Sequence, residues 1–227
     1  MTKTSQLVYQ LVTLGLLSCT SVAFAQMANP DEVEVRTVPL KKNLNVLMGV
    51  GGNIAVSSGN DGVFIIDDDI KPMSPKISAA ITALSDKPVR IVFNTHWHFD
   101  HAGGNEIFDN AGATIVAHDN VRARMSTEQN SGFFKSVTPP APAIALPVIT
   151  FDNTATFHLN GHTIKAMHVP PAHTDGDSIL FFEEANVVHL GDVFFNRMYP
   201  FIDLDSGGSV TGIIAAVDLV IPLLNEQ

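Results

Sequence analysis

The chain has 227 residues and a formal net charge of -10 at pH 7, with 23 acidic residues against 13 basic ones. A surface of that sign repels phosphate backbones, so the composition argues against nucleic acid as a partner. There is a single cysteine, Cys19, which excludes an intramolecular disulfide and any metal site built from several thiolates.

Residues 1–25 have the features of a secretory signal peptide. Lys3 provides a positive n-region, residues 7–17 form an apolar h-region, and Ala-Phe-Ala at residues 23–25 is a typical cleavage site. The apolar segment is shorter than the roughly 20 residues of a transmembrane helix. We therefore expect location in the periplasm or secretion, no stable membrane insertion after cleavage, and one mature domain over residues 26–227. A lipoprotein is the alternative, because Leu-Leu-Ser before Cys19 loosely resembles a lipobox.

The first half of the mature chain predicts strands followed by a helix. Apolar runs separated by glycine-rich turns indicate a three-stranded meander at residues 44–50, 53–58 and 62–67. Ser74 and Pro75 predict the start of a helix, with Ser74 as its N-cap. A buried strand at 89–95 follows.

The second half alternates strands and helices. The expected elements are a strand at 114–118, a helix capped by Asp119, a long surface loop at 127–147, a hairpin at 155–169, strands at 178–182 and 186–190, and a helix at 211–224. Asn160-Gly161 suits the two-residue type I′ turn of that hairpin. The order predicts an α/β fold in four layers, with two sheets packed together and helices outside.

The sequence "HWHFDH" at residues 96–101 places His96, His98, Asp100 and His101 within six positions, directly after the predicted strand 89–95. Imidazoles packed together gain little unless their nitrogens are satisfied. On an extended backbone His96 and His98 point the same way and can bind one ion, while Asp100 and His101 can face a second. Nitrogen and carboxylate ligands without cysteine favour zinc over manganese or iron, at a site left open for catalysis.

These residues match the HxHxDH signature, and the chain resembles the metallo-β-lactamase superfamily. The similarity extends through "PPAHTDGDS" (residues 170–178) and "HLGDVFF" (residues 189–195). The resemblance implies the four-layer αββα sandwich of that family. It implies a first metal held by His96, His98 and His173, and a second held by Asp100 and His101, with Asp192 bridging the two.

The resemblance also concerns Asp67, which matches an aspartate that usually supports a metal ligand from behind. The alternative is that Asp67, Asp68 and Asp69 form an ordinary solvated run. Family members normally end with a Pro-Gly-His segment on a last strand, followed by a helix, and this chain stops at Gln227 without them. We expect either a C-terminally truncated fragment lacking that strand and helix, or an enzyme that works with one ion.

The expected function is hydrolysis of a small-molecule substrate. A zinc ion with an open position lowers the pKa of bound water to about 7, and the hydroxide attacks the carbonyl of a β-lactam, lactone, ester or thioester. Asp100 would orient the nucleophile and transfer its proton. The alternatives are an iron-dependent oxidoreductase on the same fold and a metal-binding remnant without catalysis. The residues leave the oligomeric state open.

Overall fold

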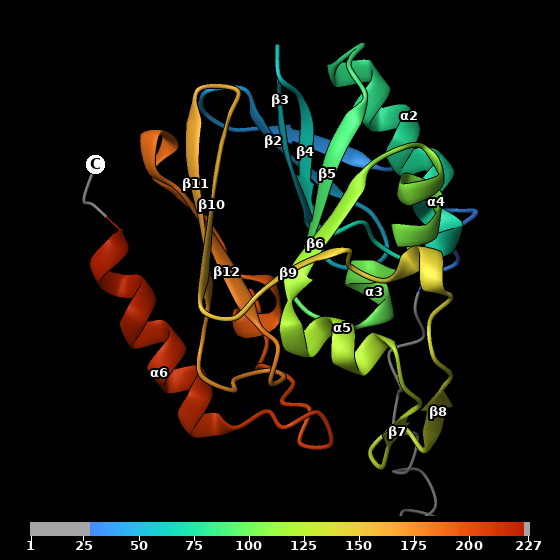
Figure 1. The fold of residues 1–227 in the computed structure, drawn as a ribbon, viewed down its shortest axis with the longest axis vertical. Coiled ribbons are helices and arrows are strands. Elements are labelled where there is room, and N and C mark those ends of the chain that lie inside the picture. The colour runs from blue at the N-terminus through green and yellow to red at the C-terminus, as the bar shows by residue number, and fades with distance from the viewer. Residues whose placement is uncertain (1–27, 225–227) are drawn as a thin grey trace, which may run out of the picture.

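Two β-sheets lie face to face between outer helices in the computed structural model, which describes residues 28–224 (Figure 1). The predicted signal peptide lies outside the described residues, as do residues 225–227. The four-layer α/β architecture predicted from the order of elements is confirmed. Within residues 28–224, no helix is both long enough and apolar enough to cross a membrane.

The first sheet has seven strands in the order β1-β2-β3-β4-β5-β6-β9. Neighbours are antiparallel from β1 to β4 and parallel from β4 to β9. The strands are β1 (Arg36–Pro39), β2 (Leu44–Met48), β3 (Ile54–Gly59), β4 (Gly62–Ile66), β5 (Val89–Asn94), β6 (Thr114–His118) and β9 (Ile149–Phe151).

The second sheet is antiparallel, in the order β10-β11-β12-β13. Its strands are β10 (Thr154–Leu159), β11 (His162–His168), β12 (Ser178–Phe182) and β13 (Val187–His189). Asn160 and Gly161 connect β10 to β11, and both have positive φ, as the predicted type I′ turn requires.

The described helices are α2 (Ser74–Leu84), α3 (Phe99–Ala102), α4 (Asn105–Asn110), α5 (Asp119–Met125) and α6 (Val210–Val220). In Figure 1, α2 and α4 lie outside the first sheet, α6 lies outside the second, and α3 and α5 lie at one end of the sandwich.

Of the four apolar clusters among residues 28–224, three join the sheets to each other and to the helices outside them. Between the sheets, Phe64 and Phe93 pack with Ile164 and Leu180, all with no exposed surface. Ile77 of α2 belongs to a second cluster with strands of the first sheet, and a third joins α6 to the second sheet. Burying a side chain of this size contributes about 1.5–3 kcal/mol, so the sheet interface is a major source of stability.

Three local predictions are wrong. Residues 127–147 are not one loop, because β7 (Gln129–Ser131) and β8 (Ser136–Thr138) pair as a small hairpin. Ser74 is the first residue of α2 and its side chain makes no cap, since a 3₁₀ turn precedes it. The cap of α5 is His118, whose Nδ1 accepts from the Asn120 amide, so the imidazole replaces the expected Asp119 carboxylate.

The register of the parallel strands aligns their carboxyl ends. Phe93 of β5 pairs with Ile66 of β4 on one side and with Val116 of β6 on the other. The residues that follow β4 and β5 therefore emerge at the same edge of the sheet, where ligand sites of α/β folds tend to form. Asp67 directly follows β4, and its amide donates to Phe93 O at 2.8 Å.

Candidate metal centre

Three segments that are distant in the sequence meet at this edge. The turn after β5 carries His96 and His98, and it leads into α3, which carries Asp100 and His101. His173 lies in the connection between β11 and β12, and Asp192 lies in a 3₁₀ turn after β13. The two sheets thus contribute to one site.

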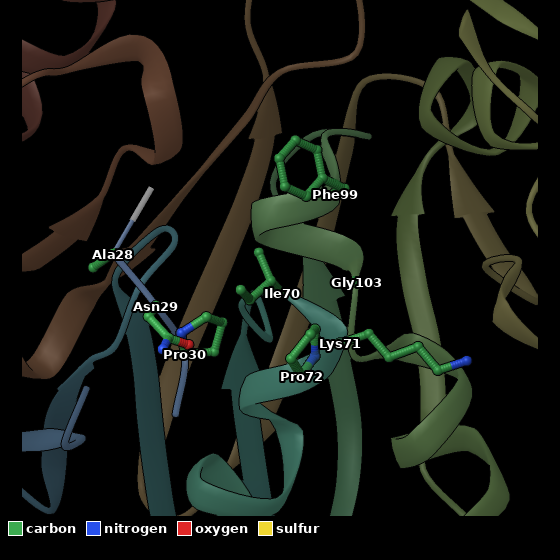
Figure 2. A pocket seen from close by; sticks show the side chains of 8 residues that line it. All are labelled: Ala28, Asn29, Pro30, Ile70, Lys71, Pro72, Phe99 and Gly103. Atoms are coloured by element: carbon green, nitrogen blue, oxygen red, sulfur yellow. The ribbon is translucent and has the colours of Figure 1, made fainter. Parts of the chain in front are cut away.

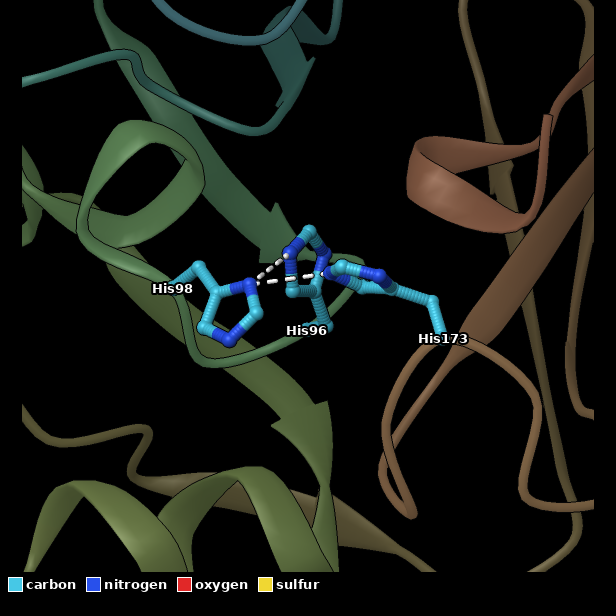
Figure 3. Close-up of side chains that lie close together, drawn as sticks. All are labelled: His96, His98 and His173. Carbon is cyan, nitrogen blue, oxygen red and sulfur yellow. Dashed lines mark hydrogen bonds between the residues drawn. The ribbon is translucent and has the colours of Figure 1, made fainter. Parts of the chain in front are cut away.

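His96, His98 and His173 form the first group of candidate ligands (Figure 3). His98 Nδ1 lies 3.1 Å from His96 Nε2 and 2.9 Å from His173 Nε2. The His96 and His173 rings are each only 1% exposed. Three ring nitrogens therefore converge on a common point beside the carboxyl ends of β4 and β5.

The outer nitrogens of these rings face acceptors. His98 Nε2 donates to Asp203 Oδ2 at 3.0 Å, and His173 Nδ1 donates to Phe201 O at 2.7 Å. Thr95 Oγ1 donates to Asp67, so it is free to accept from His96 Nδ1 at 3.1 Å.

A neutral imidazole carries one N–H, so outward donation leaves a lone pair on each inner nitrogen. Burial, followed by the neighbouring histidines, lowers the pKa of His96 well below its usual value and that of His173 to about 4, which keeps both rings neutral at pH 7. Three lone pairs aimed at one another repel unless a cation lies between them. The donor set therefore fits a divalent metal ion.

His96, His101 and Asp192 form the second group. His101 is 2% exposed, and its Nε2 lies 3.1 Å from Asp192 Oδ1 without making a well-aligned hydrogen bond among the described residues. Asp192 Oδ2 also lies 3.7 Å from His173 Nε2, so this carboxylate lies between the two groups.

Neighbouring charges shift the pKa values of His101 and Asp192 in the second group. Burial alone would lower the pKa of His101, but the Asp67 and Asp192 carboxylates more than compensate and raise it well above its usual value. Burial likewise favours the neutral form of Asp192, but the adjacent His101 ring and its charge lower the pKa of this carboxyl. Asp67 Oδ2 accepts from His101 Nδ1 at 2.7 Å, which fixes the ring from behind.

Asp100 is the one predicted ligand outside both groups. Its side chain is 31% exposed, and Oδ2 lies 3.7 Å from His101 Nε2, at the rim of the site. The structure thus brings together five of the six predicted site residues in two groups that share His96.

A pocket of about 710 Å³ lies beside α3, lined by Ile70, Phe99, Gly103 and residues 28–30 among others (Figure 2). None of the six candidate site residues lines it, so the metal centre and this pocket are separate features.

Comparison with known proteins agrees with this geometry. The family model of the metallo-beta-lactamase superfamily matches residues 50–226, most of the chain. The chain belongs to the metallo-beta-lactamase superfamily.

Solved structures of this superfamily share the fold at low sequence identity. A metallo-beta-lactamase from Cronobacter sakazakii aligns with a TM-score of 0.65 and 19% identity, covering 82% of this chain and 73% of that one. A metallo-beta-lactamase from Pontibacter korlensis aligns with a TM-score of 0.66 and 16% identity, covering 83% and 86%.

Among curated proteins, a hydroxyacylglutathione hydrolase from Dictyostelium discoideum is 28% identical over 141 residues. That match covers 59% of this chain and 45% of the relative, so it spans less than half of the relative's length.

One residue that supports the candidate metal centre, Asp203, was not predicted from the sequence. Asp203 is 7% exposed and accepts from His98 Nε2 and from Ser206 Oγ. Burial favours its neutral form, yet these hydrogen bonds lower its pKa to about 2. The available signal was the Asp-x-x-Ser sequence before Gly207, which is typical of a side-chain-capped turn.

The aspartate run after β4 is buried, so its interpretation as a solvated surface segment is wrong. Asp67, Asp68 and Asp69 have no exposed surface. Asp67 and Asp69 adopt positive φ, which turns the chain so that the carboxylates accept from nearby donors. Asp67 accepts from the Thr95 amide at 2.7 Å, and Asp69 accepts from the amides of Val50 and Gly51. This part of the centre is anchored by carboxylates.

Proposed function

We propose that this chain is a zinc-dependent hydrolase that cleaves a carbonyl compound: a β-lactam, lactone, ester or thioester. The observation that carries the proposal is the convergence of one ring nitrogen from each of three histidines. The other nitrogen of each ring donates a hydrogen bond away from the site, so the converging nitrogens have lone pairs available for a metal ion. Membership of the metallo-beta-lactamase superfamily supports metal-dependent chemistry at this site.

In this proposal His96, His98 and His173 would hold the first ion, and His101, Asp100 and Asp192 would hold the second. Asp192 lies between the two groups and would contact both ions. When bound, zinc would bring the pKa of water toward neutrality and polarise a carbonyl oxygen. Imidazole nitrogens and carboxylates, with no thiolate among them, favour zinc over iron or manganese.

The chain's own residues position the reaction. Asp67 and Asp203 orient the rings of His101 and His98, because each carboxylate accepts from a ring nitrogen on the side away from the site. Asp100 acts as the catalytic residue. Its partly exposed carboxylate at the rim can orient an attacking water and transfer its proton to solvent.

The substrate is a small molecule. The acidic charge of the chain opposes binding of nucleic acid. Because a curated relative is a hydroxyacylglutathione hydrolase, hydroxyacylglutathione takes a place in the substrate panel beside β-lactams, lactones and simple esters.

The chain is also proposed to be exported to the periplasm or beyond, with residues 1–25 removed and residues 26–227 forming the mature domain. Mass spectrometry of the protein recovered from the periplasm of an expression host tests both statements. A mature protein that begins at Gln26 is expected, and an intact or lipid-modified N-terminus would contradict them.

The function is tested by metal analysis and by hydrolysis assays on the same preparation. We expect zinc at one or two ions per chain and turnover of at least one member of the panel, which a chelator abolishes. The matched controls are His96→Ala, which removes a ligand, and His158→Ala, which removes a histidine outside both groups.

Other outcomes would replace the proposal. Bound iron with dioxygen consumption would identify an oxidoreductase on the same fold. Bound zinc without turnover of any substrate class would identify a metal-binding protein without catalysis.

A further inference from the structure

A glycine-rich loop lies against the second group of ligands. Residues 49–53 connect β2 to β3, and three of them are glycines. The Gly51 amide donates to Asp69 Oδ1 at 2.8 Å, and the Gly52 amide donates to Asp100 O at 3.0 Å. The loop is therefore tied both to the buried aspartate run and to α3.

Gly52 touches the His101 ring. A Cβ placed on Gly52 would lie 2.2 Å from His101 Cε1 and 2.6 Å from each ring nitrogen. Gly52 does not have the positive φ that disfavours alanine, so contact alone excludes a side chain at this position.

The His101 ring has little freedom to move away. Its Nδ1 is held by Asp67 at 2.7 Å, its Nε2 faces Asp192 at 3.1 Å, and its centroid lies 4.2 Å from that of His96. A side chain on Gly52 must therefore push the ring away from these partners or pull the loop from its anchors on Asp69 and Asp100.

We propose that Gly52 is a positioning residue for the second ion. Because Gly52 has no side chain, its backbone can lie against the His101 ring and hold that ring between Asp67 and Asp192. The inference rests on the proposed function, because it concerns the second of the two ion sites. The three atoms that a Gly52 Cβ would approach most closely all belong to His101 and none to the rings of the first group, so a side chain here should weaken the second ion more than the first.

The first experiment counts and titrates zinc in the parent, Gly52→Ala and Gly132→Ala. Gly132 is the control, because a Cβ there would meet Asp205 at an ordinary 3.4 Å. We expect two ions in the parent and in Gly132→Ala. Gly52→Ala should keep the first ion and bind the second about ten- to a hundredfold more weakly.

The number and affinity of the bound ions distinguish a failure of this inference from a failure of the proposed function. Two ions of parental affinity in Gly52→Ala would overturn this inference and leave the proposed function intact. A parent that binds one ion would overturn the two-ion site and the inference with it. A parent that binds none would overturn the proposed function itself.

A second experiment needs no metal. The melting temperatures of chelated parent, Gly52→Ala, His101→Ala and the double variant form a double-mutant cycle. If the alanine methyl collides with the imidazole, Gly52→Ala lowers Tm in the parent but much less in the His101→Ala background. Equal losses in both backgrounds, or a Gly52→Ala protein that does not fold and is not rescued by His101→Ala, would overturn the inference.

Discussion

Asp203→Asn tests whether a side chain more than a hundred positions from His98 in the sequence supports the metal centre. The carboxylate accepts from His98 Nε2 at 3.0 Å and from Ser206 Oγ at 2.6 Å through the same oxygen. Asparagine keeps the shape but has no charge, and its amide has a single acceptor oxygen. Asp205→Asn is the matched control, because Asp205 is exposed in the same loop and bonds to the Gly132 amide rather than to a histidine.

The magnitude follows from the pKa of Asp203. A value of about 2 in the folded chain, against about 3.9 for an unfolded aspartate, corresponds to roughly 2 kcal/mol of stability at pH 7 once solvent screening of this partly buried group is allowed for. Because the folded pKa is the lower one, this contribution is complete above about pH 5. It is lost as the pH falls through 4 toward 2, and roughly half of it remains at pH 3.

The assay is urea unfolding of the chelated protein at pH 7 and pH 3, followed by zinc titration. Trp97, the single tryptophan, reports on both. Its ring centroid lies 4.7 Å from that of His98, and its Nε1 donates to Ser206 Oγ at 3.2 Å.

For Asp203→Asn we expect a loss of about 2 kcal/mol at pH 7, a smaller loss at pH 3, and zinc affinity about ten- to a hundredfold weaker than in the parent. If Asp203→Asn behaves like Asp205→Asn in both measurements, the reasoning about this carboxylate is refuted.

Three other predictions follow from the same geometry. His96→Ala should remove most bound metal, because both groups share this ring, whereas Asp192→Ala should weaken chiefly the second ion; equal zinc content in His96→Ala and the parent would contradict the assignment. EDTA should lower the free energy of unfolding of the zinc-loaded protein by about 4 kcal/mol if free zinc stands at a thousandfold excess over Kd, and an unchanged Tm on chelation would argue against a shared ion. Phe93→Ala should cost about 3–5 kcal/mol in urea unfolding, since the ring is fully buried between the sheets, and a loss below 1 kcal/mol would contradict that packing.

The order of the layers and the principal candidate ligands could be predicted from local features of the chain. Alternation of apolar residues and the glycine-rich turns mark β2 to β4 because these are local properties of the chain. The spacing of His96, His98, Asp100 and His101 is equally local, so the motif can be recognised in the amino-acid sequence alone. The helix cap was predicted less well, since His118 performs the role expected of Asp119.

The surroundings of those ligands could not be predicted, because they depend on contacts between segments that are far apart in the chain. His98 and Asp203 are 105 positions apart, and Gly52 contacts His101 from a different loop. Neither contact produces a periodic pattern in the sequence from which it could be predicted. The aspartates after β4 look like a surface run in the sequence, yet they are buried because positive φ at Asp67 and Asp69 turns them toward inward-facing donors. Side-chain chemistry specifies what an ion needs, whereas the burial and orientation of each ring depend on which loops the folded sheets bring together.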